Sequence, residues 1–159
     1  MGFRRTPTGI LLRVSQTSAT PPDSTAVGSL SPDITGRFVE HLGVEFVEAT
    51  GDRVVATWEA RPDLHQPYGI VHCGVHCSVI ETLASIGAAF WFAEQQPDGK
   101  VVGVNNNTDF YRAVREGTLT STATPLHRGR SQQVWVVETV DAEGRTAARG
   151  QVRLQNLGG

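Results

Sequence analysis

The sequence predicts a single α+β domain in which an antiparallel sheet of about six strands wraps around one long central helix. One apolar segment of helical length, residues 75–93, lies in the middle of the chain. Short runs rich in β-branched residues lie on either side of it, separated by turns that contain Gly or Asp. Strands that follow one another through short turns pair as hairpins, so we expect the sheet to be antiparallel.

Length, charge and cysteine content limit the class of protein. The 159 residues fit one domain that can bury a core without disulfides. A net charge of -2 argues against nucleic acid as the main partner. The two cysteines, Cys73 and Cys77, are four residues apart in one expected helix and are interpreted as reduced thiols. No stretch is judged long and apolar enough to span a membrane, so we expect a cytoplasmic protein without a membrane partner.

The N-terminal part divides into an extension and the start of the domain. Residues 1–30 are rich in Ser, Thr, Pro and Gly and are expected to be a flexible extension, with the domain over residues 31–159. A short helix is expected from Ser31, a typical helix start, to Gly43, a typical stop. Two β-rich runs in residues 44–60 then flank a turn and predict a hairpin.

The central helix is expected to be buried, because residues 75–93 are apolar on almost every side. The preceding residues 60–74 are expected to be a loop. Strands are predicted after the helix over residues 101–111, 118–127, 132–140 and 146–155.

Glu81 is the only charged residue between His76 and Glu94. Burial of a carboxylate without a partner is costly and raises the pKa of a carboxyl group. A lone Glu in such a helix therefore indicates either a catalytic group or a side chain that reaches water or an arginine. The residue types alone leave both interpretations open.

Neighbouring groups favour acyl transfer. Ser85 is one turn after Glu81 and shares its helix face, and Gln66 offers an amide in the loop before the helix. The backbone N–H groups near Cys73 and Gly74 lie at the expected helix N-terminus, where unpaired donors favour a developing oxyanion. A carboxylate that attacks or activates water and donors for a carbonyl oxygen are the parts that such a reaction needs.

The stretch HQPYGIVHCGVHCSVIETLAS resembles the signature of hot-dog-fold thioesterases of the phenylacetate and 4-hydroxybenzoyl-coenzyme A type. The later stretches GVNNNTDFYRAVREGTL and PLHRGRSQQVWVVETVDAEGRTAARGQVRLQNL resemble the third strand and the last hairpins of that family. The resemblance covers roughly residues 34–157. It implies a hot-dog fold and hydrolysis of an aryl- or acyl-coenzyme A thioester to the free acid and coenzyme A.

Residue by residue, the resemblance implies a catalytic set. Glu81 becomes the nucleophile or general base, Gln66 an amide that positions the substrate, and Ser85 the group that orients water. The backbone N–H of Cys73 becomes the donor that polarises the thioester. The family usually has Gly at this position, so a side chain here crowds a site whose backbone donor is kept.

The same resemblance implies substrate-binding positions and an assembly. His72 matches a histidine that supports the loop, and Gly74 matches the second glycine of the signature. Apart from the resemblance, Asn105, Asn107 and Asp109 alternate on one strand face, so that face is expected to be polar and either lines the acyl pocket or bonds neighbouring backbone. Basic residues expected either to meet the phosphates of coenzyme A or to be ordinary solvated residues are Arg112, Arg128 and Arg130. A homodimer or homotetramer with the active site between subunits is implied, with no cofactor and no metal.

Other functions are weighed against this one. The run HCGVHC invites a zinc site, but its His pair and its Cys pair point about 100° apart on a helix. A Cys73 nucleophile activated by the helix N-terminus lacks a motif for its base. A non-catalytic acyl-coenzyme A-binding protein of the same fold remains the alternative. A dehydratase of the same fold needs an Asp/His pair that is not found at the start of this helix, and the identity of the acyl group stays open.

Overall fold

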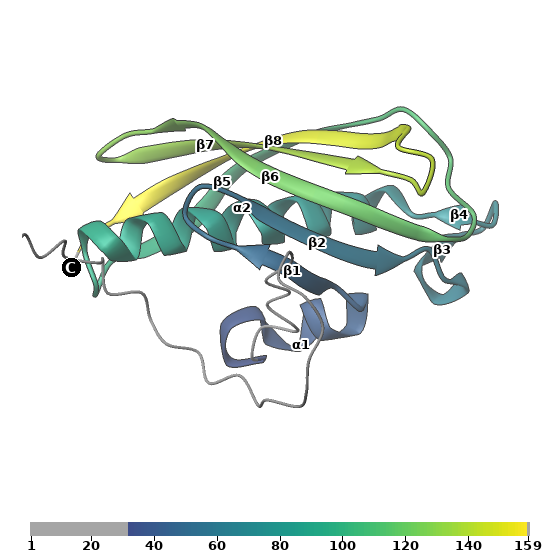
Figure 1. Ribbon diagram of the computed structural model, residues 1–159, viewed down its shortest axis with the longest axis horizontal. Coiled ribbons are helices and arrows are strands. Elements are labelled where there is room, and N and C mark those ends of the chain that lie inside the picture. Colours follow the sequence, from purple (N-terminus) through teal and green to yellow (C-terminus); the bar gives the residue numbers. More distant parts are fainter. Residues whose placement is uncertain (1–31, 159) are drawn as a thin grey trace, which may run out of the picture.

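The computed structural model describes residues 32–158, which form one long helix along one face of a six-stranded sheet (Figure 1). The long helix α2 spans Cys73–Gln95, and the shorter helix α1 spans Pro32–Leu42. The strands of the large sheet are β1 (Glu45–Ala49), β2 (Val54–Glu59), β5 (Lys100–Phe110), β6 (Thr118–Arg128), β7 (Gln132–Val140) and β8 (Thr146–Leu157). The predicted α+β architecture is confirmed, whereas the predicted extension over residues 1–30 lies outside the described residues.

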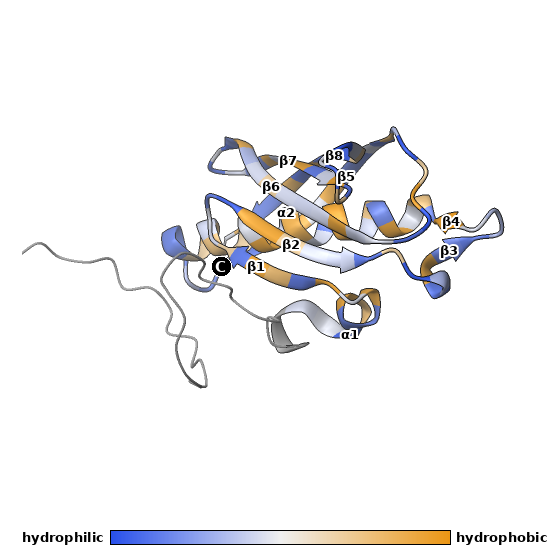
Figure 2. Ribbon diagram, turned by 45° about the vertical axis from the view of Figure 1, so that its right-hand side comes forward, coloured by the Kyte–Doolittle hydropathy of each residue, from blue (hydrophilic) through white to orange (hydrophobic). Residues whose placement is uncertain are grey.

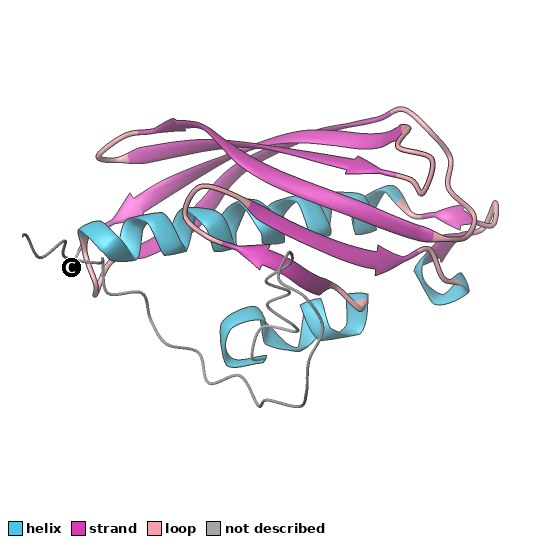
Figure 3. Cartoon of the chain, in the orientation of Figure 1, coloured by secondary structure: helices cyan, strands magenta, loops and turns pink. Residues whose placement is uncertain are grey.

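The large sheet, whose strands are magenta in Figure 3, is antiparallel at every pairing and has the strand order β1-β2-β6-β7-β8-β5. Tight turns join β1 to β2, β6 to β7 and β7 to β8, as the turn residues predict. Helix α2 separates β2 from β5 along the chain, and β5 pairs with β8 instead. Strands β1 and β5 are therefore the two edges of the sheet.

The core lies between α2 and the sheet, where Figure 2 shows hydrophobic residues on both elements. Alternate residues of the central strands are buried there, as the period of a half-buried sheet requires. They include Val54, Trp58, Leu119, Trp135, Val137, Val152 and Leu154. A Cβ atom at Gly87 of α2 would lie 2.6 Å from the Trp135 ring, so a glycine at this position allows the helix to approach the sheet.

The segment expected to be a loop contains short regular elements. A 3-10 turn, η1, spans Pro62–Leu64, and a separate two-stranded sheet is formed by β3 (His65–Gln66) and β4 (Ile70–Val71). Strands of two residues are too short to show an alternating apolar pattern, so the sequence does not predict them. They form a small hairpin directly before α2.

The expectation that α2 is buried on all sides is wrong for the single chain. The face toward the sheet is fully buried at Val79, Ile80 and Leu83. The opposite face carries an exposed Glu81 and the half-buried Ser85. Most residues on that face are small or carry a hydroxyl group, so the segment contains few charged residues. The absence of charge was therefore a poor guide to whether this face is buried.

Helix α2 also departs from the expectation that no segment is apolar enough to cross a membrane. By length and hydropathy alone, α2 could cross a membrane, because its mean hydropathy is 1.4 over an 18-residue window. Within the domain, 44% of that window is buried, because the helix is the core helix of the sheet. Its composition thus reflects packing against β6, β7 and β8.

Candidate active site

The N-terminus of α2 leaves one backbone donor open. The ring of His72 caps the helix, with Nδ1 accepting a hydrogen bond of 2.9 Å from the N–H of Gly74. The N–H of Val75 bonds to the carbonyl of His72. Within the described part of the chain, no acceptor is found for the N–H of Cys73. His72 and Gly74 therefore support the helix end, and the N–H of Cys73 is the donor that remains available to a ligand.

The hairpin that carries Gln66 is held from a distant part of the chain. Gln66 begins a turn that closes with a hydrogen bond from the N–H of Gly69 to the carbonyl of Gln66. The Arg115 guanidinium donates two hydrogen bonds of 3.0 Å, to the carbonyls of Tyr68 and Gly69. The N–H of Val71 bonds to the carbonyl of Val114. The amide of Gln66 is thus presented by a short hairpin fixed against the segment that precedes β6.

Glu81 lies on the open face of α2, beside the edge strand β5. Its carboxylate packs against Gly103, where a Cβ atom would lie 2.8 Å from Oε1. Ser78 and Thr82 donate their hydroxyl protons to helix carbonyls one turn earlier. No such bond is found for Ser85 within the described residues, and its hydroxyl lies one turn from the carboxylate. Glu81 and Ser85 therefore line one hollow.

Two adjacent hollows follow the open face of α2 beneath α1. The first has a volume of about 330 Å³, contains Glu81 and Ser85, and is lined on its apolar side by Phe38, Val39 and Ile86. The second has a volume of about 430 Å³ and lies over the start of α2. Its lining is more polar and includes His41, Asp63, His65, His72 and Gly74. Phe38 and Ser78 belong to both hollows.

Asn105 lies away from this groove. It pairs across the sheet with Arg153, and paired residues of neighbouring strands point to the same face. The next residue, Asn106, points toward the helix and donates a hydrogen bond of 3.0 Å to the carbonyl of Cys77. A bulge between Gly103 and Asn105 precedes this change of direction. In its own chain, Asn106 faces the helix that carries Glu81, and Asn105 does not.

The Arg128 guanidinium is bound to other residues of its own chain. Its guanidinium donates hydrogen bonds of 2.7 Å to the carbonyl of Gly51 and to the Asp52 carboxylate, and it lies 5.4 Å from the centre of the Trp91 ring. These contacts tie the β1–β2 turn to the end of α2. Arg130 lies two residues further along in the β6–β7 turn and is exposed.

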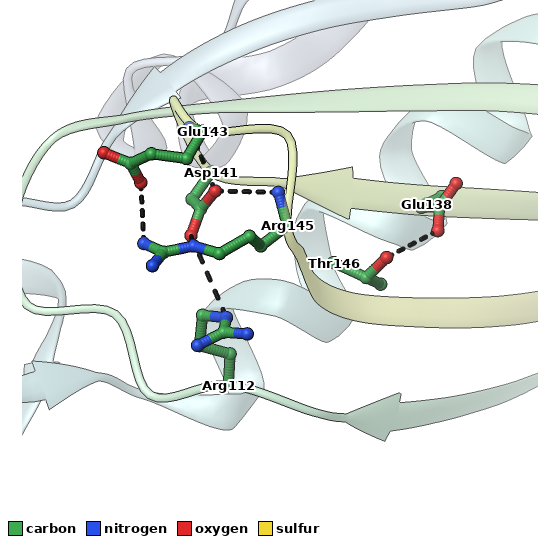
Figure 4. A network of polar contacts seen from close by, with 6 residues as sticks. All are labelled: Arg112, Glu138, Asp141, Glu143, Arg145 and Thr146. Atoms are coloured by element: carbon green, nitrogen blue, oxygen red, sulfur yellow. Dashed lines mark hydrogen bonds and ion pairs between the residues drawn. The ribbon is translucent and has the colours of Figure 1, made fainter.

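Arg112 belongs to a cluster of charges at the β7–β8 turn (Figure 4). Its Nε lies 3.9 Å from an Asp141 oxygen that also accepts a hydrogen bond from the Arg145 side chain. Desolvation acts to raise the pKa of Asp141, but hydrogen bonds from the backbone and side chain of Arg145 hold it below its ordinary value. Glu143 pairs with the same arginine. Arg112 thus has an acidic neighbour but keeps an exposed guanidinium.

His76 is a buried titratable residue to which the sequence assigns no role. It is only 3% exposed, and its ring meets the Trp58 ring edge to face at 5.3 Å. Among residues 32–158, no hydrogen-bond partner is found for its Nδ1. Desolvation lowers the pKa of His76 to about 4, so the ring is neutral at pH 7. It faces the core and takes no part in the groove.

The sequence reasoning also missed Phe38, Gly103 and Arg115 as contributors to the site. Phe38 reads as one more apolar position of a short helix, although it lines both hollows. The contacts of Gly103 and Arg115 join segments that lie far apart in the chain, so no local pattern could reveal them. Phe38 lies four residues before Leu42, a spacing that predicts a shared apolar face, so no local pattern marked it as a residue of the groove.

Chemically, the groove offers a carboxylate, a neighbouring hydroxyl and, at the start of the same helix, an open backbone donor. A carboxylate with access to water can attack a carbonyl carbon or remove a proton from water. An N–H at a helix N-terminus stabilises the oxyanion that forms. These groups suit the hydrolysis of an activated acyl compound.

Comparison with known proteins agrees with this chemistry. The family description "Thioesterase superfamily" matches residues 68–148. A Mycobacterium tuberculosis protein named as a candidate esterase is 49% identical over 125 residues, covering 79% of this chain and 89% of that protein. Its solved structure superposes with a TM-score of 0.75 and covers 77% of this chain and 98% of that chain.

Two further relatives are named for thioester hydrolysis. The proofreading thioesterase EntH of Cronobacter turicensis is 31% identical over 130 residues, covering 82% of this chain and 93% of that protein. The 1,4-dihydroxy-2-naphthoyl-CoA hydrolase of Listeria monocytogenes is 35% identical over 102 residues, covering 64% of this chain and 80% of that protein.

Proposed function

Because the chain belongs to the thioesterase superfamily and is a thioester hydrolase of the hot-dog fold, we propose that its substrate is an aryl- or acyl-coenzyme A thioester. Glu81 acts on the thioester carbonyl, either as nucleophile or as general base for water. The observation that carries this proposal is the hollow in which the Glu81 carboxylate lies one turn from Ser85 and beside an apolar wall. The name of the Listeria relative supports a coenzyme A thioester with an aromatic acyl group.

The oxyanion donor and the carboxylate of one chain are too far apart for one carbonyl. Cys73 and Glu81 are separated by about 12 Å along the helix axis and about 80° around it. A reacting carbonyl group lies within about 3 Å of both its nucleophile and its oxyanion donor. The site is therefore assembled from two copies of the chain, with Glu81 of one facing the Cys73 N–H of the other.

The edge strand β5 supports such an assembly. It is 11 residues long, and no strand pairs with its outer edge among the described residues. Val102, Val104 and Phe110 on this strand are large, apolar and exposed. A long exposed edge strand has unpaired backbone N–H and C=O groups, so it is a template for pairing with another chain. Two copies that pair along β5 form a symmetric dimer, and Asn105 then lies at the subunit contact.

Gln66 and the arginines have supporting roles in this proposal. The Gln66 amide positions the acyl group at the end of the hairpin that Arg115 holds. Arg112 and Arg130, whose guanidinium groups are exposed, meet the phosphates of coenzyme A. Arg128 supports the turn that carries Arg130, because its own donors are bound within the fold.

The activity is tested by a hydrolysis screen over aryl- and alkyl-coenzyme A esters, with detection of the released thiol. Turnover of at least one member at a rate that scales with enzyme concentration is the expected result. A protein that binds these esters without cleaving any of them is a non-catalytic binding protein of the same fold.

The shared site is tested by mixing two inactive variants. Glu81→Gln removes the carboxylate, and Cys73→Pro removes the N–H donor at a first helical position where proline is well tolerated. In a mixed dimer one of the two sites is intact. Because random pairing makes about half of the dimers mixed, refolding equal amounts of the two variants together restores about a quarter of wild-type activity. If each chain held a complete site, mixing would restore nothing.

A further inference from the structure

Phe38 is an exposed aromatic residue on helix α1, close to two buried apolar residues of the same helix. Its side chain is 60% exposed, whereas the neighbouring Val39 and Leu42 are 6% and 2% exposed. Water contact with a large ring is unfavourable, so this position is not explained by packing of α1 onto the core. The residue lines both hollows of the groove along α2.

The part of α1 that carries Phe38 is fixed in place. Gly36 interrupts the helix with φ 76° and ψ 164°, and the following turn packs through Val39 and Leu42. The Arg61 guanidinium donates hydrogen bonds to the carbonyls of His41 and Leu42 at the end of this helix. Arg61 is itself held by Asp63. The Phe38 ring is thus presented by an anchored turn.

The ring stands between the two hollows of the groove. The residues common to both hollows are Phe38 from α1 and Ser78 from α2, so these two residues lie where the hollows meet. The hollow with Glu81 is apolar along Phe38, Val39 and Ile86, whereas the hollow over the helix start is lined by histidines and Asp63. Phe38 therefore lies between a hollow with an apolar wall and a hollow with a more polar lining.

We infer that Phe38 is a specificity-determining residue that limits the length of the acyl group, an inference that rests on the proposed function of Glu81. A volume of about 330 Å³ accommodates a compact acyl group. An aromatic acyl group packs against the Phe38 ring by an offset or edge-to-face contact. A long straight acyl chain has to pass the ring to reach the second hollow, so the wild-type protein selects against it.

The experiment compares kcat/KM for benzoyl-coenzyme A and dodecanoyl-coenzyme A in the wild type and in Phe38→Ala. Removal of the ring joins the two hollows and removes the aromatic contact. We expect the ratio of dodecanoyl to benzoyl kcat/KM to rise by about tenfold or more. Phe38→Trp places a larger ring between the two hollows and is expected to lower that ratio. Phe38→Leu provides a milder variant with a smaller rise if Phe38→Ala folds poorly.

Leu126→Ala is the matched control, since Leu126 is also large, apolar and 66% exposed but lies on β6 and lines neither hollow. Its ratio should equal that of the wild type. An unchanged ratio in Phe38→Ala, in a wild type that cleaves both esters, overturns the inference alone. Dissociation of folded Phe38→Ala into monomers also overturns it, because the ring then belongs to a subunit contact. A wild type that cleaves no ester overturns the proposed function as well.

Discussion

The carboxylate of Glu81 lies directly against the backbone of Gly103, so close that a Cβ atom on Gly103 would be 2.8 Å from Oε1. Gly103 is the last residue before the bulge of β5. The edge strand and the central helix therefore set the position of the carboxylate together. A small change on the strand should move the carboxylate without altering the helix that carries it.

Gly103→Ala is expected to lower kcat while leaving the fold intact. Gly103 is not among the glycines with positive φ, so alanine suits its backbone, and the atom it meets is the free end of a flexible side chain. Displacement of the carboxylate by about 1 Å lowers kcat on the order of tenfold or more. Steady-state kinetics and thermal unfolding measure both effects.

Gly158→Ala is the control for that variant. Its Cβ atom would lie 2.8 Å from the Gln96 side-chain oxygen, a similar displacement of a flexible side chain away from the groove. Its kcat should match that of the wild type. Equal kcat in Gly103→Ala and Gly158→Ala would mean that the position of the Glu81 carboxylate does not govern turnover.

Glu81→Gln should keep the fold and the subunit assembly but lose most turnover. The amide has nearly the same shape as the carboxylate and can act neither as nucleophile nor as base. Loss of general-base assistance alone lowers kcat on the order of a hundredfold or more. Glu94→Gln, on an exposed position of the same helix, is the control and should retain full activity. Wild-type turnover in Glu81→Gln would remove Glu81 from the mechanism.

The sequence predicts the elements of this fold well because each has a strong local signal. The start of α1, the β1–β2 hairpin and the four later strands lie within about two residues of their predicted bounds. The hairpin of β3 and β4 was missed, since its two-residue strands are fixed by contacts with Arg115 and Val114 far along the chain. Pairing of β5 with β8 likewise depends on packing around α2.

The site was less predictable than the fold. The four-residue spacing of Glu81 and Ser85 predicts a shared helix face, and both residues line one hollow. The burial of Glu81 was inferred from the composition of α2, but composition does not say which side of a helix a sheet covers. The alternation of Asn105 with its neighbours was recognised, yet which alternate residues face the helix depends on the bulge after Gly103.

Variants at Cys73 separate its backbone from its thiol. Cys73→Gly and Cys73→Ser keep the open N–H and should retain the wild-type kcat. Cys73→Pro lacks the thiol, as those two variants do, and also lacks the N–H donor at a position where proline fits. Loss of one oxyanion donor lowers kcat on the order of a hundredfold or more. The measurement is kcat for each folded variant. Inactivity of folded Cys73→Ser would instead assign the chemistry to the thiol.

His76 should make the protein less stable in mild acid. The folded protein holds the ring neutral, with a pKa lowered to about 4 by burial, whereas an unfolded chain binds a proton near the ordinary value of 6.5. As pH falls from 6.5 toward 4, the unfolded state gains a proton that the folded state cannot bind, so stability is lost in this window. The loss from pH 7.5 to pH 5 is about 2 kcal/mol.

Urea unfolding of the wild type and of His76→Leu at these two pH values checks that prediction. The variant lacks the titrating ring but keeps all other histidines, so its loss of unfolding free energy should be smaller by about 2 kcal/mol. An equal loss in both proteins would show that the ring of His76 takes up a proton in the fold as readily as in the unfolded chain.

Arg128 and Arg130 should behave differently although they are two residues apart. Arg130→Ala removes an exposed guanidinium, so it should raise KM for coenzyme A esters several-fold with little change in kcat, because a phosphate contact binds ground and transition states alike. It should not change KM for an N-acetylcysteamine thioester, which lacks the nucleotide.

Arg128→Ala removes the Asp52 ion pair and the Trp91 contact and should lower the free energy of unfolding by about 1 kcal/mol. Its effect on KM should be the same for both substrates. If Arg130→Ala leaves KM unchanged for coenzyme A esters, Arg130 is an ordinary turn residue, and the phosphate contact passes to Arg112, whose guanidinium also remains exposed.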